Sequence, residues 1–175
     1  MDLCSCAFTG HRPKSLPWRY NESSPDCTML KDVLAEQIKT LADDGVTGFI
    51  SGMAQGVAQI VLDLRKKNPA IKLCCALPCD NQEIKWSSSV RTQYHSILEQ
   101  ANKIVRTGHE YTKKCMLDRN RYMVDHAGIL LAVYNGSYQS GTGMTVRYAQ
   151  SKKRKIIVID PITREVSRIN EELRI

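Results

Sequence analysis

Two short segments of this sequence contain the small residues that suit a phosphate-binding turn. One is Ser51–Gly56, with the sequence SGMAQG, and the other is Ser140–Gly143, with the sequence SGTG. Glycines let backbone N–H groups approach an anion closely, and a helix that begins there adds unpaired donors and partial positive charge. The simpler alternative is that these glycines only form tight turns between a strand and a helix. Because two such segments occur, we favour ligand binding.

Neither segment is a standard nucleotide-binding motif. The Walker pattern G-x4-G-K-[ST] does not occur, and neither does the dinucleotide fingerprint G-x-G-x-x-G. The spacing of Gly52 and Gly56 differs from both patterns. In the second segment, Thr142 or Thr145 is placed to cap the helix that follows.

A third candidate segment, Thr9–Arg12, follows the first apolar run of the chain directly. The guanidinium of Arg12 is a planar fork that suits a phosphate or a carboxylate. His11 can act as an acid, a base or a hydrogen-bond donor. The alternative is that His11 and Arg12 only organise the proline-containing loop over residues 11–26.

Acid–base chemistry would need titratable side chains near these segments, and three are available. His11 and Asp80 each follow an apolar run, and Asp125 lies in a charged amphipathic stretch over residues 113–126. On that stretch we expect Asn120 and Tyr122 to reach the strand ends, with Asn120 contacting the ligand, and Arg121 to lie on a solvated face. The candidate catalytic residues are therefore His11, Asp80 and Asp125. The predicted ligand-binding residues are Thr9, Gly10, Arg12, Ser51, Gly52, Met53, Gln55, Gly56, Ala58, Asn120, Asn135, Ser140, Gly141, Thr142 and Gly143.

Short apolar runs and longer amphipathic stretches alternate along the chain. The apolar runs are residues 3–9, 48–51, 72–77, 103–106, 129–134 and 155–159, and the stretches with helical spacing are 29–41, 55–67, 90–101, 113–126 and 142–151. Several runs lack polar alternation, which is typical of strands buried on both faces of a parallel sheet. The pattern predicts an α/β fold of the Rossmann-like, doubly wound kind, with a mainly parallel sheet of about six strands flanked by helices. The tail from Pro161 fits either a short edge strand or a final helix.

These elements would bring the candidate segments together, because ligands of open parallel sheets bind outside the carboxyl ends of the strands. Thr9–Arg12, Ser51–Gly56, Pro78–Asp80 and residues 135–143 all follow predicted strands. The fold and the chemistry thus point to the same edge of the sheet.

The composition fits one globular domain over residues 1–175. Hydrophobic residues make up 42% and charged residues 25%, which excludes a disordered, collagen-like or coiled-coil chain. A net charge of +7 favours polyanionic partners. The basic run Lys152–Lys155 is typical of a solvated helix end, so we do not expect a nucleic-acid partner. We see neither a membrane-length apolar run nor a signal peptide, and expect a cytoplasmic protein without a membrane partner.

The cysteines fit a reducing compartment. There are seven, and most lie inside apolar runs, where they act as small buried hydrophobic residues. They lack the C-x2-C pairs of a structural zinc site, so we predict no metal and no cofactor. Cys79 and Cys115 are expected to be the more exposed thiols.

Taken together, several segments resemble a known family. These are FTGHRP at residues 8–13, SGMAQGV at residues 51–57, RYMVD at residues 121–125, Gly141-Thr142, and Ile159-Asp160-Pro161. In this order they are similar to the YpsA-like branch of the SLOG superfamily, from about residue 6 to residue 161. The resemblance implies a Rossmann-like fold and often a homo-oligomer. The superfamily includes DprA DNA-binding proteins, Lonely Guy phosphoribohydrolases and proteins that bind nucleotide-derived signals.

Two departures from the family pattern bear on function. The second motif of the family usually ends in Asp, whereas this chain has Ala58, which cannot contact a ribose as a carboxylate would. Natural divergence and an engineered inactivating change both explain the alanine at position 58, and the sequence does not distinguish them. The late Gly-Gly-Thr of the family is Ser140-Gly141-Thr142 here, and residues 142–147 lack the acid that Lonely Guy enzymes have after this motif.

The sequence therefore supports three functions in descending order. The first is a protein that binds a nucleotide or nucleotide-derived signal, as a sensor or a sequestering protein. The second is an N-glycosidic hydrolase of a nucleotide or cyclic nucleotide, disabled here by Ala58. The third is DNA binding through the basic surface, as the resemblance to DprA would allow.

Overall fold

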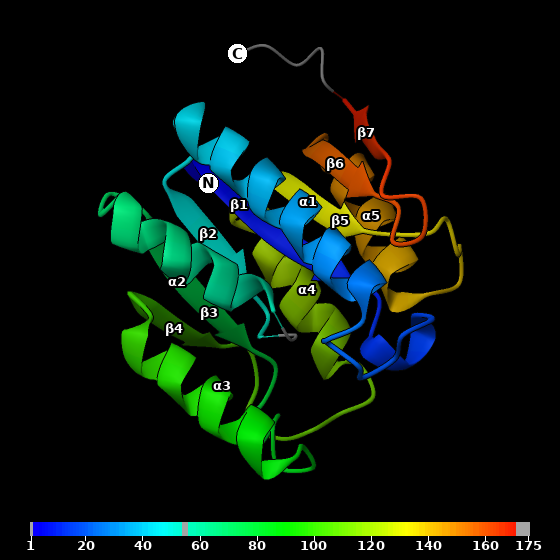
Figure 1. Cartoon of the computed structure of the whole chain (residues 1–175). Coiled ribbons are helices and arrows are strands. Elements are labelled where there is room, and N and C mark those ends of the chain that lie inside the picture. Colours follow the sequence, from blue (N-terminus) through cyan, green and yellow to red (C-terminus); the bar gives the residue numbers. More distant parts are fainter. Residues whose placement is uncertain (1, 54–55, 171–175) are drawn as a thin grey trace.

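The structure is a computed structural model that describes residues 2–53 and 56–170 (Figure 1). The strands are β1 (Asp2–Gly10), β2 (Gly48–Ser51), β3 (Lys72–Leu77), β4 (Lys103–Arg106), β5 (Ala127–Val133), β6 (Lys155–Ile159) and β7 (Val166–Ile169). The helices are α1 (Pro25–Asp43), α2 (Val57–Lys67), α3 (Ser88–Gln100), α4 (Cys115–Asp125) and α5 (Gly141–Ser151), with a 3-10 turn η1 over Pro13–Ser15.

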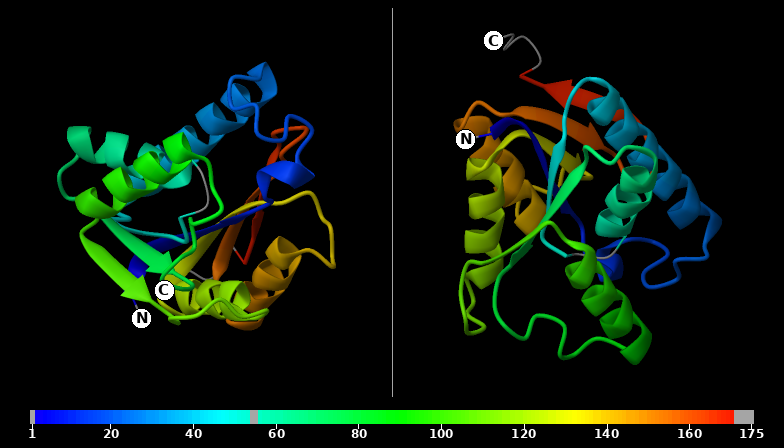
Figure 2. Two further views of the ribbon diagram at one scale, coloured as in Figure 1. Left: turned by 90° about the horizontal axis from the view of Figure 1, so that it is seen from below. Right: turned by 90° about the vertical axis from the view of Figure 1, so that its left-hand side faces the viewer.

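The strands form one sheet in the order β4-β3-β2-β1-β5-β6-β7. Every neighbouring pair from β4 to β6 is parallel, and only β6 and β7 are antiparallel. Helices α1, α2 and α3 cover one face of the sheet, and α4 and α5 cover the other (Figure 2). The predicted Rossmann-like α/β fold is therefore confirmed.

The seventh strand goes beyond the predicted sheet. After β6 the chain reverses around Asp160, whose Oδ1 accepts hydrogen bonds from the backbone N–H groups of Ile162 (2.7 Å) and Thr163 (2.9 Å). This turn sends the tail back along β6, so it forms an antiparallel edge strand and not a helix.

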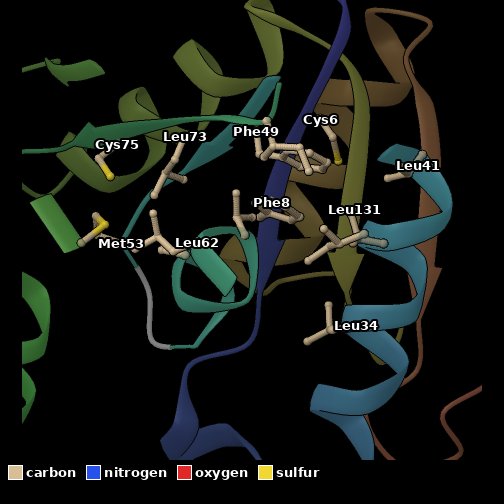
Figure 3. Close-up of a cluster of buried hydrophobic side chains, with 14 of the residues drawn as sticks. Cys6, Phe8, Leu34, Leu41, Phe49, Met53, Leu62, Leu73, Cys75 and Leu131 are labelled. Carbon is tan, nitrogen blue, oxygen red and sulfur yellow. The ribbon is translucent and has the colours of Figure 1, made fainter. Parts of the chain in front are cut away.

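Strand residues alternate between two apolar layers because successive side chains point to opposite faces of a sheet. On the side of α1–α3, Phe8 stacks on Phe49 with ring centroids 5.9 Å apart. Leu34 of α1 and Leu62 of α2 pack into the same cluster (Figure 3). On the other side, Ala7 belongs to the cluster that α4 and α5 cover. Because helices cover both faces of the sheet, the strand sequences do not alternate between apolar and polar residues.

The helix bounds differ from the predicted ones mainly at α1. This helix begins at Pro25, whereas the periodicity predicted a start at Met29. Proline suits the first position of a helix because its missing N–H would be unpaired there, and Asp26 adds a favourable negative charge to the first turn. The predicted irregular loop over residues 11–26 therefore ends in helix and contains η1. Within the described residues, no helix is long and apolar enough to cross a membrane.

Candidate functional site

The carboxyl ends of the parallel strands form one edge, and the chain changes direction there between β1 and β5. After β1 the chain leads to α1 on one face, and after β5 it leads to α5 on the other face. Such a switch point is where open α/β sheets bind ligands. The predicted segments Thr9–Arg12 and Asn135–Gly143 meet at this point, because β1 and β5 pair up to Gly10 and Val133.

His11 joins the two segments at the switch point. Its backbone N–H donates to the carbonyl of Val133 (3.3 Å), and the N–H of Asn135 donates to its Nε2 (3.2 Å). Its ring also lies 5.8 Å from the ring of Tyr134. Burial lowers the pKa of His11 below its ordinary value, and the Asn135 side chain opposes this shift. A neutral imidazole is the form whose Nε2 can accept the bond from Asn135, so His11 has an organising role at the switch point.

Ser51 and Met53 form a local turn at the carboxyl end of β2. The N–H of Met53 donates to Oγ of Ser51 (3.1 Å), and Met53 adopts a positive φ of 61°. Gly56 has a φ of 100° and precedes the first residue of α2, where no side chain caps the helix. The N-terminus of α2 therefore has backbone donors without a side-chain cap. The predicted ligand-binding residue Gln55 lies outside the described residues.

Arg119 of α4 reaches this loop from the opposite face of the sheet. Its Nη1 donates to the carbonyl of Gly52, and a Cβ added at Gly52 would collide with the guanidinium. Its Nε donates to Oδ1 of Asn120 (2.9 Å). The guanidinium occupies the space that a side chain at position 52 would need, so only glycine fits there without a shift of Arg119.

The charge of Arg119 is buried without a carboxylate beside it. The residue is only 8% exposed, and burial lowers its pKa to about 10, assisted by the positive charge of Arg12. In the part of the chain that the structure describes, no Asp or Glu forms an ion pair with it. A buried cation usually has a counter-charge, so this centre has the electrostatic character of an anion site.

A chain of hydrogen bonds links Arg119 to the loop after β5. The amide Nδ2 of Asn120 donates to Oγ1 of Thr145 (3.0 Å), and this hydroxyl donates to the carbonyl of Gly141 (2.9 Å). Asn120 therefore connects the middle of α4 to the first turns of α5. Through these bonds α4 and α5 hold the two small-residue loops in a fixed relation.

The N-terminus of α5 combines a cap with an open position. Oγ of Ser140 accepts a bond from the N–H of Gly143 (2.9 Å), which caps the helix. A Cβ at Gly143 would approach the carbonyl of Ser137, so this glycine is required by packing. A Cβ at Gly141 would meet nothing within 4 Å, and this residue is exposed. Of the two glycines in the first turn of α5, Gly141 is thus the one whose added Cβ would enter free space.

Ala58 is the second residue of α2, and it is 2% exposed. Its methyl group lines a small pocket of about 20 Å³ together with Gly56, Trp86 and Tyr94. The rings of Trp86 and Tyr94 meet edge to face with centroids 5.5 Å apart. The position where the family motif has a carboxylate therefore faces an aromatic wall from α3 and the loop before it.

The three predicted catalytic residues are not brought together. His11 lies at the end of β1, whereas Asp80 follows β3, two strands away, and pairs with Arg106 (3.2 Å) and His109 (3.3 Å). Asp125 ends α4 and accepts a hydrogen bond from the hydroxyl of Tyr148 (2.9 Å). It lies at the opposite end of α4 from the strand carboxyl ends, where it ties α4 to α5.

Sequence reasoning missed two polar residues of this edge. Arg119 shares a helix face with Cys115 and Met123, which are both buried. An arginine at helical spacing between two apolar residues could have indicated that Arg119 is buried. Gln82 has no comparable signal, because its donation to the carbonyl of Gly52 (3.1 Å) depends on the path of a loop.

The predicted exposure of two thiols is wrong. Cys79 is 2% exposed and Cys115 is 6% exposed, and their side chains interact. Cys115 is the first residue of α4 and faces inward toward the loop after β3, so each thiol covers the other. The described residues contain no group of His, Cys, Asp and Glu side chains that could hold a metal ion.

The strand order and the helices on both faces define this protein as one of the Rossmann-like α/β class. The YpsA family model, described as the YspA SLOG family, matches residues 6–164. The chain belongs to this family, as the motifs indicated.

Several bacterial relatives share most of the chain. The SPbeta prophage-derived protein YoqJ of Bacillus subtilis is 33% identical over 144 residues, which cover 73% of this chain and 84% of the relative. A UPF0398 protein of Bacillus pumilus is 26% identical over 83% of this chain and 81% of its own length. The UPF0398 protein BH1768 of Halalkalibacterium halodurans is 27% identical over 85% of this chain and 81% of its own length.

A pair of glycine substitutions tests the packing of Arg119. Gly52→Ala should destabilise the fold by about 1–3 kcal/mol, because the added methyl group overlaps the guanidinium. Gly141→Ala should stay within about 0.5 kcal/mol of the wild type, because its methyl group enters free space. Urea unfolding measures both values. Equal stabilities for the two variants would contradict the described position of Arg119.

The lowered pKa of His11 predicts a loss of stability in acid. The unfolded chain takes up the imidazole proton near the ordinary pKa of 6.5, before folded His11 does, so stability falls as the pH drops below 6.5. His11→Gln should therefore lose less stability than the wild type between pH 7.5 and 5.5. His109→Asn is the control, because the side chain of His109 is 84% exposed. Thermal unfolding at the two pH values measures the difference, and identical losses in all three proteins would refute this assignment.

Proposed function

We propose that this protein binds a nucleotide or nucleotide-derived molecule at the carboxyl edge of the sheet, as a sensor or sequestering protein. The phosphate group lies between the loops after β2 and β5, and Arg119 supplies the counter-charge. The protein retains the ligand without cleaving it. Membership of the YspA SLOG family supports a nucleotide-related role for the Rossmann-like fold.

The buried guanidinium of Arg119 is the observation that carries this proposal. A buried charge lowers the stability of the fold unless an opposite charge or strong hydrogen bonds compensate it. Arg119 has the carbonyl of Gly52 and the amide of Asn120 but no carboxylate among the described residues. A bound phosphate would supply the missing negative charge, and a guanidinium binds phosphate through paired donors.

The helix termini beside Arg119 favour the same ligand. The N-terminus of α2 has no side-chain cap, and α5 begins at the exposed Gly141. Because α2 and α5 cover opposite faces of the sheet, a phosphate at the switch point would lie near positive helix ends from both layers.

Retention without turnover fits the positions of the acid–base candidates better than hydrolysis does. His11 is held by Val133 and Asn135, Asp80 is held by Arg106 and His109, and Asp125 lies at the far end of α4. Ala58 offers no carboxylate beside the aromatic pocket. The alternative function, an N-glycosidic hydrolase disabled at residue 58, would need that carboxylate for bond cleavage.

Mass spectrometry of the purified protein after incubation with a nucleotide panel tests the proposal. The panel contains nucleoside monophosphates, NAD, ADP-ribose and cyclic signalling nucleotides, and Ala58→Asp is treated in parallel. The expected result is an intact nucleotide retained by both proteins. Product that appears only with Ala58→Asp would identify a disabled glycosidic hydrolase. No retained nucleotide in either protein would reject nucleotide binding.

Two arginine variants of α4 test the role of the buried charge. Arg119→Met should weaken binding of the retained nucleotide by roughly 10-fold to 100-fold, because a charged hydrogen bond is lost. The free energy of unfolding should stay the same or rise, because the variant buries no charge. Arg121→Met is the matched control, since the Arg121 side chain is 51% exposed and pairs weakly with Asp118. Calorimetric titration measures the affinity, and urea unfolding measures the free energy of unfolding. Equal affinities in the two variants would show that Arg119 does not contact the ligand.

A further inference from the structure

The loop between β3 and α3, residues 78–87, is attached to the candidate site by one side chain. Nε2 of Gln82 donates to the carbonyl of Gly52 (3.1 Å). The same carbonyl accepts a hydrogen bond from Arg119. Gln82 and Arg119 therefore converge on one atom of the loop after β2, although they come from different segments.

Two buried oxygen atoms of this loop have no hydrogen-bond partner. They are Oε1 of Gln82 and Oε2 of Glu83, and the third such side-chain atom among the described residues is Oε1 of Gln37 in α1. The Glu83 side chain is only 10% exposed, and its Oε1 lies 3.4 Å from Nε2 of His95. A buried acceptor without a donor lowers stability, so two adjacent ones at a candidate site call for a functional explanation.

Glu83 lies near Tyr94, one of the residues that line the aromatic pocket beside Ala58. The backbone N–H of Trp86 donates to the carbonyl of Glu83 (2.9 Å), so a turn of the loop joins Glu83 to Trp86, which also lines the pocket. Tyr94 also lines the pocket, and its pKa is raised first by burial and then by the negative charge of Glu83. Glu83 is thus a carboxylate close to the wall where Ala58 supplies none.

The polarity of the two ends of the site is opposite. Arg119 provides buried positive charge, whereas Gln82 and Glu83 provide unpaired acceptors and a negative charge. A phosphate has acceptor oxygens and is repelled by a carboxylate, so it suits only the Arg119 end. The sugar and base of a nucleotide carry hydroxyl and amino donors, which suit the acceptor end.

We propose that Gln82 and Glu83 form the nucleoside-recognition wall of this site and accept hydrogen bonds from the ligand's O–H and N–H groups. This inference rests on the proposed nucleotide-binding function. Both oxygen atoms are buried in the free protein, so the ligand reaches them only when the groups that cover them move aside. The unpaired acceptors make the site selective for a nucleoside phosphate over a bare phosphate.

Titrations with three probes separate the two ends of the site. The probes are inorganic phosphate, ribose 5-phosphate and adenosine monophosphate, and calorimetry is performed on the wild type, Glu83→Gln and Gln37→Met. Glu83→Gln keeps the shape of the side chain but removes its charge. Gln37→Met removes the unpaired oxygen of α1 and serves as the matched control. Gln82→Met is a second variant on the wall, used in the same way if Glu83→Gln does not fold.

We expect the wild type to bind adenosine monophosphate more tightly than inorganic phosphate, and Glu83→Gln to weaken that binding about tenfold or more. Binding of inorganic phosphate should be unchanged in Glu83→Gln, and Gln37→Met should match the wild type with every probe. A loss shared by ribose 5-phosphate supports contact with the sugar hydroxyls, and a loss confined to adenosine monophosphate supports contact with the base. The melting temperature of Glu83→Gln should not fall, since the variant leaves no carboxylate unpaired.

Two results would overturn the inference in distinguishable ways. If the wild type binds adenosine monophosphate and Glu83→Gln binds it equally well, the wall has no role, and the proposed function stands. If the wild type binds none of the three probes and also retains no nucleotide of the mass-spectrometry panel, the proposed function fails, and the inference fails with it.

Discussion

The contact between the Arg119 guanidinium and the carbonyl of Gly52 is the constraint on which the carboxyl edge of this protein depends. It joins a helix on one face of the sheet to a loop that leads to a helix on the other face. It also explains the absence of a side chain at residue 52, since any Cβ would overlap the guanidinium. A charge placed at this depth shapes its surroundings, because both its hydrogen bonds and its counter-charge must come from a few nearby groups.

The same contact divides the edge into two environments. Toward α5, the bonds from Asn120 to Thr145 and on to Gly141 continue the network from the guanidinium to an exposed helix start. Toward α3, Gln82 and Glu83 present acceptors beside aromatic rings. An edge with one cationic side and one accepting side orients a ligand that is itself divided into an anionic end and a donor-rich end. Orientation of this kind requires no catalytic group, which is consistent with the proposed binding of an intact ligand.

The fold could be predicted well because it depends on local periodicity and on strand burial. The runs that became β1 to β6 were apolar on both faces, and the segments after them were rich in small residues. The site was less predictable where it depends on long-range geometry. Asn120 bonds to Thr145 near the start of α5, whereas Asp125, the last residue of α4, lies toward the opposite edge of the sheet. The sequence does not predict Arg119 as a site residue, because a charged residue on a helix is usually solvated. Only the packing of α4 shows that the helix face with Arg119 is buried. Gln82 reaches Gly52 through a loop whose path no periodic pattern encodes.

The central position of β1 also has a consequence for synthesis of the chain. β1 pairs with β2 on one side, but its partner on the other side, β5, begins at residue 127. At about 5–20 residues per second, the ribosome delivers β5 on the order of ten seconds after β1. During that interval one edge of the central strand has no partner, and the bond between Asn135 and His11 that closes the switch point does not exist. The switch point therefore closes only after β5 has been synthesised, and a product that ends before residue 127 would lack it.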